Sequence, residues 1–293
     1  MKRLLILDVN ALFHRAHSAM TRACGPMVNS LGMHVTGTYG VLNSLFSTLE
    51  KTDYDSIVPC TEGGSNWRKV ESTGYKGGRE GKDDAFYSDL SILLEDAFPA
   101  IGMTVCKQQT YEADDVIAHV ARHSPAYDEV HILTCDKDLL ACVTNKVKVI
   151  LFSSTKKTEL VDIDGVLKHF GVYPAEVPFY KAIAGDSSDN IAGIPKLGPK
   201  TAAKIIQESR QSEVNPEFSA ADKIALHPKI APHASTFIAN LRIVDLTKDV
   251  KDLRWFASSS PDPLHVEALF ESLEFKSFLK RKGKILQTLG CPQ

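Results

Sequence analysis

The chain has 293 residues, an apolar fraction of 43%, a charged fraction of 24% and a formal net charge of −2. Its length can bury one large core or two ordinary ones, and its composition excludes a disordered or fibrous chain. The near-neutral charge gives no global signal for nucleic acid, and no apolar run reaches the roughly 18 residues that a membrane span needs. The six cysteines show no C-x-x-C pair or zinc-finger spacing, so we expect buried free thiols and a reducing cytosol.

The first half of the chain alternates between strand-like and helix-like patterns. Short apolar runs predict buried strands, and apolar residues that recur every three or four positions predict helices. The predicted strands are 3–9, 55–60, 102–106, 129–135 and 147–152. The predicted helices are 37–50, 84–98, 112–123 and a short one at 137–143. This order predicts an α/β domain with a mostly parallel sheet, helices on both faces, and ligand sites beyond the carboxyl ends of the strands.

Two regions depart from this alternation. Residues 63–82 contain six glycines, which predicts a mobile segment. From about residue 163 the strand pattern fades into helical patterns. These helices are predicted at 163–170, 175–185 and 199–209. A mixed tail follows, and its apolar runs at 243–246 and 253–256 are candidates to return to the first domain.

Carboxylates gather where the predicted strands and helices end. Eight of them form four groups: Asp8; Glu112, Asp114 and Asp115; Asp136 and Asp138; Asp186 and Asp189. Bunched acids repel one another and resist burial unless a cation cancels their charge, and hard divalent cations such as Mg²⁺ take oxygen ligands. The sequence therefore predicts a single polynuclear metal site, and the main use of such sites is phosphoryl chemistry.

Each group of acids has a plainer explanation when taken alone. The block 112–115 suits a helix N-cap, 136–138 suits a turn with a cap, and 186–190 suits a polar loop with an Asx-turn. Asp8 is the exception, because a carboxylate that ends an apolar strand needs a partner. We prefer the shared metal site because it explains all four groups at once.

The stretch 193–203 (GIPKLGPKTAA) resembles a helix-hairpin-helix turn, with a helix predicted from residue 199. In such a turn, backbone N–H groups and the following helix N-terminus face a phosphate, so the site reads backbone and not bases. The candidate residues are Gly193, Ile194, Gly198 and Thr201, with charge added by Lys196, Lys200 and Lys204. The alternative is a plain glycine-proline turn between two helices.

Basic and aromatic side chains alternate within the glycine-rich segment, where Trp67 and Arg68 are followed by Tyr75, Lys76 and Arg79. Such a pattern suits single-stranded nucleic acid, which needs both stacking and charge, although a solvated basic loop is the alternative. Beside an acidic metal cluster, Lys76 and Arg79 become candidates to offset charge on a scissile phosphate. The ten histidines are scattered, and we interpret them as packing or surface residues.

These motifs together resemble the 5′ nuclease family, which includes flap endonucleases, phage 5′–3′ exonucleases and the 5′ nuclease domain of bacterial DNA polymerase I. The resemblance covers roughly residues 3–210 and rests on LLILDVNAL, TYGVLNSLF, NWRKVESTGYKGGR, YEADDVIA, ILTCDKDL, GDSSDNIAGI and IPKLGPKTA. It implies a PIN-like α/β domain at 1–175 with an arch or clamp at about 63–95. It also implies a helix-3-turn-helix DNA-binding region, followed by a tail, at 176–293.

The resemblance also implies roles for individual residues. Asp8, Glu112 and Asp114 would form a first metal site, Asp136 would lie between sites, and Asp115 would lie close by. The second site would be built from Asp138, Asp186 and Asp189. Lys76 and Arg79 match arch residues that contact the scissile phosphate, and 193–201 match a duplex-gripping hairpin that in relatives can hold K⁺.

One position departs from the family pattern. Relatives carry an aspartate after the second strand, shortly before the aromatic-arginine pair, whereas the nearest carboxylate here is Glu62. We assign Glu62 the missing ligand role, because its longer side chain could reach a metal directly or through water. If it does not, the first ion would bind more weakly.

The implied activity is that of a 5′–3′ exonuclease and structure-specific flap endonuclease that uses two or three Mg²⁺ ions, with Mn²⁺ as a substitute. The expected partner is DNA with a 5′ flap, a branch or a 5′-ended duplex, and we expect a stand-alone, cytoplasmic monomer with no membrane partner. The alternatives are a branched-DNA-binding protein with weak catalysis, a PIN-type ribonuclease, and a haloacid-dehalogenase-like phosphatase suggested by Asp136-Lys-Asp138. The phosphatase chemistry needs its aspartate pair on the first strand, where this chain has Asp8-Val-Asn10.

Overall fold

The computed structural model describes residues 1–78, 81–152, 158–211 and 218–291, so Arg79 lies outside the described residues. Within this part of the chain the centre is a five-stranded sheet with the order β2-β1-β3-β4-β5. Its strands are β1 (Arg3–Asp8), β2 (Ser56–Cys60), β3 (Glu129–Thr134), β4 (Val147–Phe152) and β5 (Thr158–Val161). The first four run parallel, and β5 pairs antiparallel with β4. The predicted α/β class and mostly parallel sheet are confirmed.

The parallel register brings the carboxyl ends of three strands to one edge of the sheet. β1 lies between β2 and β3, with Asp8 opposite Cys60 and Leu7 opposite Leu133. The predicted strand at 102–106 is wrong, because only Cys106 forms an isolated bridge, to Cys60. The backbone there serves other partners, since Met103 donates to the carbonyl of Phe98 at the end of a helix.

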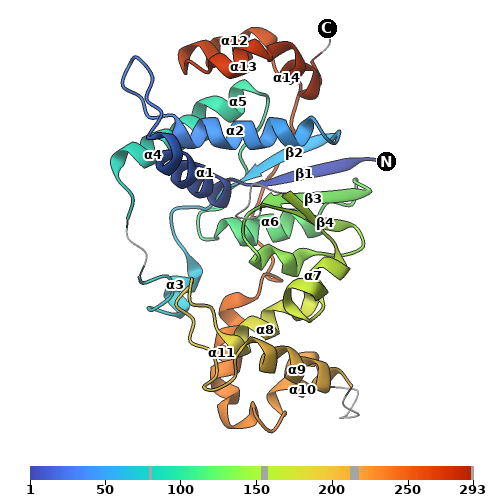
Figure 1. Ribbon diagram of the computed structural model, residues 1–293. Coiled ribbons are helices and arrows are strands. Elements are labelled where there is room, and N and C mark those ends of the chain that lie inside the picture. Colours follow the sequence, from blue (N-terminus) through green and yellow to red (C-terminus); the bar gives the residue numbers. More distant parts are fainter. Residues whose placement is uncertain (79–80, 153–157, 212–217, 292–293) are drawn as a thin grey trace.

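Helices cover both faces of the sheet (Figure 1). The face of Leu5 and Leu7 packs against α1 (Val9–Cys24), α2 (Thr36–Leu49), α4 (Asp84–Ser91), the π-helix η1 (Ile92–Ala97) and α5 (Phe98–Ala100). The face of Leu4 and Ile6 packs against α6 (Ala113–Arg122), the 3-10 helix η2 (Asp138–Cys142) and α7 (Ile163–Phe170). Alternate residues of one fully buried strand therefore serve two cores, as expected for parallel strands.

The sequence interpretation did not include α1. The helix begins at Asp8, whose Oδ1 accepts from the N–H of Ala11 at 3.1 Å, and it buries Val9, Leu12, Phe13 and Ala16. It packs tightly on α2, where a side chain at Gly37 would collide with Phe13 and one at Gly40 with Ala16. Asp8 therefore ends a strand and caps a helix, which fixes its carboxylate at the sheet edge.

A helical unit lies below the sheet in the view of Figure 1. It contains the 3-10 helices η3 (Pro174–Glu176) and η4 (Ala231–His233), together with α8 (Val177–Ala184), α9 (Pro199–Arg210), α10 (Ala220–Ala225) and α11 (Ala234–Val244). Between sheet and unit lies the short helix α3 (Trp67–Glu71), in the segment that was predicted to be an arch. The predicted helices of the second half are present within about two residues of their expected ends.

After α11 the chain returns to the first half of the protein, as expected from its apolar runs. Arg122 of α6 donates to the carbonyls of Leu246 and Lys248, and the N–H of Ile57 in β2 donates to Ser258. The chain ends in α12 (Pro263–Ser272), α13 (Lys276–Lys280) and α14 (Lys282–Thr288), which pack over α2 and α5 (Figure 1). No helix among the described residues is long and apolar enough to cross a membrane.

Candidate metal centre and phosphate-binding surface

The fold brings the predicted acids together from four separate segments. Asp8 ends β1, Asp136 and Asp138 follow β3, and Glu112 and Asp114 begin α6. The turn after α8 adds Asp186 and Asp189, and a carboxylate oxygen of Asp138, Asp186 and Asp189 lies within 4.8 Å of the other two. Residues that are up to about 180 positions apart thus share the edge where parallel strands end.

Asp8 is the most deeply placed acid of the group. Its side chain is 1% exposed, and its Oδ2 accepts from the hydroxyl of Thr134 at 2.5 Å. Burial raises the pKa of Asp8 to about 6, with help from the charges of Asp136 and Glu62 and against the hydrogen bonds that it accepts. Thr134, which the sequence interpretation missed, also accepts from the N–H of Asp136 at 2.9 Å and so couples two acids.

Glu112 is held by three donors from the segment 67–76. Arg68 Nη1 lies 3.0 Å and the Tyr75 hydroxyl 2.8 Å from Oε2, while Lys76 Nζ lies 2.5 Å from Oε1. Burial would raise the pKa of Glu112, but Lys76 and Arg68 outweigh it and lower the pKa below its usual value. Glu112 is therefore a neutralised carboxylate in this structure.

The structure corrects the role of Arg68, which was expected to contact a single strand. Its side chain is buried, and it donates to both oxygens of Asp115 at 2.6 and 2.7 Å and to the carbonyl of Ile243 at 2.7 Å. Trp67 donates to Asp115 at 3.1 Å, and its ring lies under Arg68 and Lys248. The buried Arg68 therefore supports the acid cluster and is not free to contact DNA, whereas a DNA contact by the half-buried Trp67 stays a prediction.

The structure also changes the roles predicted for Tyr75 and Asp115, because both side chains are buried. Tyr75 is 4% exposed, and its hydroxyl bridges Glu112 and Asp189, so its ring is not a stacking platform. Asp115 is fully buried and forms a capping box with Glu112, and both of its oxygens are occupied by Arg68. It is therefore a structural partner of the cluster, and we withdraw it as a metal ligand.

Lys76 joins the two halves of the acid cluster. Its backbone has a left-handed φ of 53°, its N–H donates to the carbonyl of Asp189 at 3.0 Å, and its side chain reaches Glu112. Burial lowers the pKa of the Lys76 ammonium, but Glu112 and Asp189 outweigh it and raise the pKa above its ordinary value. Lys76 is thus a charged donor inside the site, as its expected phosphate-contacting role requires.

Lys181 is the functional residue that sequence reasoning missed most clearly. It comes from the buried face of α8, is 8% exposed, and forms ion pairs with Asp138 and with Asp186, the latter at 2.6 Å. Burial raises the pKa of Asp138 to about 7, with help from Asp136 and against Lys181, whereas Lys181 and Ser188 lower the pKa of Asp186 to about 2 despite burial. A lysine within the apolar run VPFYKAIA was the available signal.

The residues present fit a hard divalent cation. A pocket of about 20 Å³ opens among the acids, roughly the room of one water or ion, and it is lined in part by Glu112, Asp114, Asp138 and Asp189. Burial raises the pKa of Asp114 well above its ordinary value, and the charges of Asp136, Asp8 and Asp138 add to this effect. Carboxylate oxygens beside an ion-sized space are the ligands that Mg²⁺ or Mn²⁺ requires, and an ion there would compete with the ammonium groups of Lys76 and Lys181.

Glu62 lies at the mouth of the cluster. It is exposed, and its Oε1 accepts from Asn10 Nδ2 at 3.0 Å, while Asn10 Oδ1 accepts from the Thr61 hydroxyl and the N–H of Glu62. Asn10 therefore directs Glu62 toward Asp8, whose pKa its charge helps to raise. A water-mediated ligand role for Glu62 stays a prediction.

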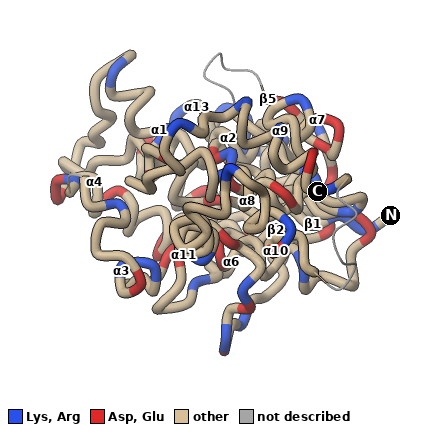
Figure 2. The backbone as a smooth tube through the Cα atoms, turned by 90° about the horizontal axis from the view of Figure 1, so that it is seen from below, with Lys and Arg blue, Asp and Glu red and all other residues tan. Residues whose placement is uncertain are grey.

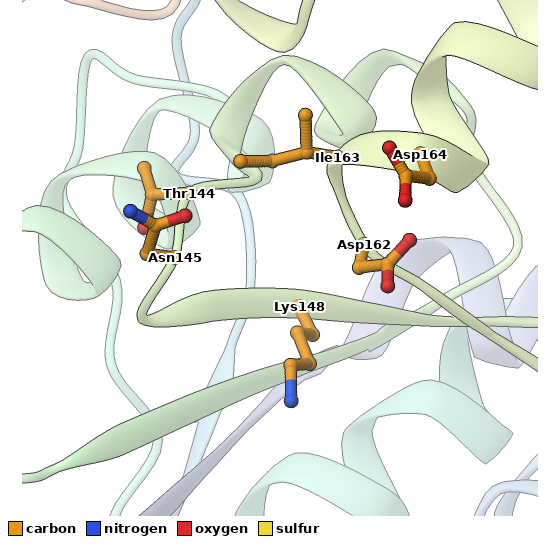
Figure 3. Close-up of a pocket in the computed structure, with 6 residues that line it drawn as sticks. All are labelled: Thr144, Asn145, Lys148, Asp162, Ile163 and Asp164. Atoms are coloured by element: carbon orange, nitrogen blue, oxygen red, sulfur yellow. The ribbon is translucent and has the colours of Figure 1, made fainter.

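A larger hollow of about 370 Å³ lies elsewhere, beside β4 and the start of α7 (Figure 3). Its lining residues are Thr144, Asn145, Lys148, Asp162, Ile163 and Asp164. Asp162 is used as the N-cap of α7, and Lys148 donates to Glu129 at 2.6 Å. None of the predicted site residues lines it, so chemistry and not volume identifies the functional site.

The predicted hairpin lies between α8 and α9. The N–H of Ile194 donates to the carbonyl of Ile183. Gly185 and Gly193 lie so close together that a side chain on either would collide with the backbone on the opposite side of the turn. The helix α9 starts from Gly198 without a side-chain cap. Its surroundings carry the exposed side chains of Lys196, Lys200 and Lys204. Figure 2 views this end of the molecule, where basic and acidic segments alternate around α8 and α11.

Comparison with known proteins identifies the family. Residues 3–171 match the family model described as 5′-3′ exonuclease, N-terminal resolvase-like domain, and residues 172–262 match 5′-3′ exonuclease, C-terminal SAM fold. The chain belongs to the 5′-3′ exonuclease family. This membership removes the phosphatase alternative, and Asn10, in the first turn of α1, is bonded to Glu62.

The family relatives include both separate exonucleases and parts of longer proteins. The chain is 30% identical to a 5′-3′ exonuclease of Aquifex aeolicus over 98% of its own length and 97% of the relative. It is 29% identical to DNA polymerase I of Treponema pallidum over 90% of the chain, and 28% identical to the thermostable DNA polymerase I of Thermus aquaticus over 96%. The chain spans only 26% and 33% of those two polymerases.

Solved structures confirm the PIN-like fold. A bacteriophage T5 protein crystallised with metal ions superposes with a TM-score of 0.61 at 19% identity, over 98% of this chain and 99% of that chain. The catalytic core of Rad2 in complex with DNA substrate gives a TM-score of 0.57 at 17% identity, over 98% and 92%. Human GEN1 in complex with Holliday junction DNA gives 0.57 at 17%, over 98% and 72%.

Proposed function

We propose that this protein is a Mg²⁺-dependent 5′–3′ exonuclease and structure-specific flap endonuclease that hydrolyses DNA phosphodiesters in replication or repair. The observation that carries the proposal is the convergence of acids from the start of η2, the start of α6 and the 186–189 turn around an ion-sized pocket of about 20 Å³. Burial, with added repulsion between neighbouring acids, raises the pKa values of Asp8, Asp114 and Asp138, so a bound cation would favour their charged forms. Membership in the 5′-3′ exonuclease family supports DNA as the substrate.

The acids divide into two proposed ion sites. Asp8, Glu112 and Asp114 would hold the first ion with Glu62 at its mouth, Asp136 would lie between the sites, and the second ion would be held by Asp138, Asp186 and Asp189. When bound, the two ions would activate a water and stabilise charge on the leaving oxygen. Mn²⁺ would replace Mg²⁺, because it also prefers carboxylate and water ligands. The expected products carry a 5′-phosphate and a 3′-hydroxyl.

Lys76 would contribute by moving from an acid to the substrate. Its ammonium is bound to Glu112, so an ion at Glu112 would release it toward the scissile phosphate, where it would offset developing charge. Because the N–H of Lys76 is tied to the carbonyl of Asp189, the side chain would move about a fixed backbone. We propose the same phosphate-contacting role for Arg79 from its family position.

The hairpin between α8 and α9 would bind the duplex part of a flapped, branched or 5′-ended DNA. The N-terminus of a 12-residue helix and the exposed Lys196, Lys200 and Lys204 suit contact with backbone phosphates. The residues Gly193, Ile194, Gly198 and Thr201 would supply the turn, and its carbonyl groups could take K⁺ as an accessory ion. We further propose a monomer in a reducing cytosol, supported by six free cysteines.

The decisive test is Asp136→Asn assayed on a 5′-flap substrate with and without Mg²⁺. Cleavage should be abolished while DNA binding, measured by fluorescence anisotropy, stays close to the wild-type value. Asp164→Asn, in the hollow of Figure 3, is the matched control and should cleave normally. Unchanged turnover of Asp136→Asn would overturn the metal assignment. If the unsubstituted protein bound the flap but did not cleave it in Mg²⁺, the branched-DNA-binding alternative would be favoured.

A further inference from the structure

A second group of potential ligands lies at the opposite end of α6 from the acid cluster. His119 is in the last turn of this helix, His123 follows one turn later at its C-cap, and Asp249 lies in the segment that returns from α11. Asp249 Oδ1 is 3.7 Å from His119 Nδ1 and 3.7 Å from His123 Nε2. None of these residues takes part in the proposed nuclease centre.

We propose that His119, His123 and Asp249 form a binding site for a transition-metal ion of the Zn²⁺ class. An ion with ligand bonds of about 2.1 Å in tetrahedral geometry sets neighbouring ligand atoms about 3.4 Å apart. The two separations of 3.7 Å are a few tenths longer, so small side-chain movements would close the site. Two imidazoles and one carboxylate favour Zn²⁺, Ni²⁺ or Cu²⁺ over Mg²⁺, with water as the fourth ligand.

The hydrogen bonds of the two histidines place their lone pairs on the correct nitrogens. His123 Nδ1 lies 2.9 Å from the carbonyl of His119 and donates to it, which leaves Nε2 free to bind an ion. His119 Nδ1 accepts from the N–H of Val250 at 3.1 Å, so this nitrogen carries the ring's single lone pair, which the ion would have to take from that N–H. Burial, His123 and Arg122 lower the pKa of His119, which keeps its ring neutral and able to ligate at pH 7.

Two groups compete with the ion, and both can yield. The N–H of Val250 would give up its bond to His119 at a cost in free energy, because Val250 is only 3% exposed. Arg122 Nη2 lies 3.8 Å from Asp249 Oδ1, but its guanidinium is committed to the carbonyls of Leu246 and Lys248. An exposed ion pair of this kind is worth little, so Asp249 can turn toward the imidazoles.

An ion here would act as a clasp between α6 and the return segment. The same segment contributes Leu246 to the lining of the acid pocket, and the end of α11 just before it contributes Ile243, whose carbonyl accepts from Arg68. The clasp would therefore stabilise the packing behind the nuclease centre without touching its ligands. It follows that Zn²⁺ should raise thermal stability and leave Mg²⁺-dependent cleavage unchanged at one equivalent.

The test is isothermal titration calorimetry of the whole protein with ZnCl₂ in excess Mg²⁺, which occupies the carboxylate centre. Wild type should bind one more Zn²⁺ equivalent than His119→Gln/His123→Gln. Asp249→Asn should weaken that equivalent at least about tenfold, because even outer partners of a metal are typically worth roughly 10–100-fold. Zn²⁺ should raise the unfolding temperature of wild type but not of the double variant.

Matched controls separate this site from other Zn²⁺ ligands. His265→Gln, an exposed histidine 3.9 Å from Asp262, should bind Zn²⁺ as wild type does. Asp186→Asn/Asp189→Asn, which damages the carboxylate centre, should keep the extra equivalent, so failure of the nuclease proposal would not affect the result. The single variant His123→Gln changes a half-exposed side chain and guards against misfolding. Equal stoichiometry and affinity in wild type, His123→Gln and the double variant would overturn the proposal.

Discussion

The acids around Glu112 and those around Asp8 share one cluster but are stabilised by opposite means. Glu112 and Asp115 are buried against Arg68, Tyr75 and Lys76, and the pKa of Glu112 is lowered. Asp8 and Asp114 belong to the same cluster. Among the described residues they have no basic side chain as a hydrogen-bond partner, and their pKa values are raised. The first pair therefore belongs to the fold of the metal-free protein, whereas the second is held ready for a cation.

The largest expected effect, on the cleavage rate, comes from removing an acid that has no basic hydrogen-bond partner, such as Asp114. Asp114→Asn should lower the cleavage rate by about three orders of magnitude, since an ion that stabilises the transition state contributes several kcal/mol. Its free energy of unfolding without metal should stay equal or rise, because an unneutralised buried charge is lost. Single-turnover cleavage and urea unfolding in EDTA measure the two quantities. A destabilised but active variant would contradict the comparison.

Removing the cation that neutralises Glu112 and Asp115 should instead lower the stability of the protein. Arg68→Met leaves Asp115 and Glu112 buried and unpaired, and breaking a buried pair costs about 3–5 kcal/mol of unfolding free energy. Urea unfolding of the metal-free protein measures this loss. Lys69→Met, its exposed neighbour in α3, is the control and should change stability little. A small effect of Arg68→Met would show that Arg68 is not the support of the cluster.

The pH dependence of metal-free stability should reveal the acids of the second kind. Because the pKa of Asp8 rises to about 6 in the folded state from its ordinary value near 4, the folded protein binds the proton more tightly than the unfolded chain. Stability should therefore fall as pH rises from about 4 to 6, by about 2–3 kcal/mol from this group. Asp8→Asn should reduce that slope in EDTA, because Asp114 and Asp138 supply the rest, and Mg²⁺ should reverse the loss in wild type. An equal slope in wild type and Asp8→Asn would exclude Asp8 as its source.

The smallest expected effect concerns Lys181, which pairs with acids that are also proposed ligands of the second ion. Its ammonium already pairs with Asp138 and Asp186, so an ion there must displace it. Lys181→Gln should strengthen Mn²⁺ binding at the second site by about tenfold, equal to about 1.4 kcal/mol, as counted by electron paramagnetic resonance. Lys196→Gln, exposed on the hairpin, is the control. Weaker Mn²⁺ binding in Lys181→Gln would show that Lys181 orients the ligands and does not compete.

The sequence by itself determined the class of fold and the chemistry of the site. Short apolar runs predicted four of the five described strands, and acids at the ends of the predicted strands and helices predicted a shared metal centre. These features are local, because an acid that follows an apolar strand must lie at a strand end wherever the strand is placed. The parallel order then requires the strand ends to meet at one edge.

Tertiary structure decided which acids are neutralised and by which partners. Arg68, Tyr75 and Lys181 looked like loop or helix residues, but contacts across 37 to 47 positions bury the first two against Glu112 and Asp115. The edge strand β5 and the single bridge at Cys106 likewise depend on which neighbour the backbone meets. Sequence patterns record the preferences of one segment, whereas charge compensation is a property of a pair, and only the fold brings the pair together.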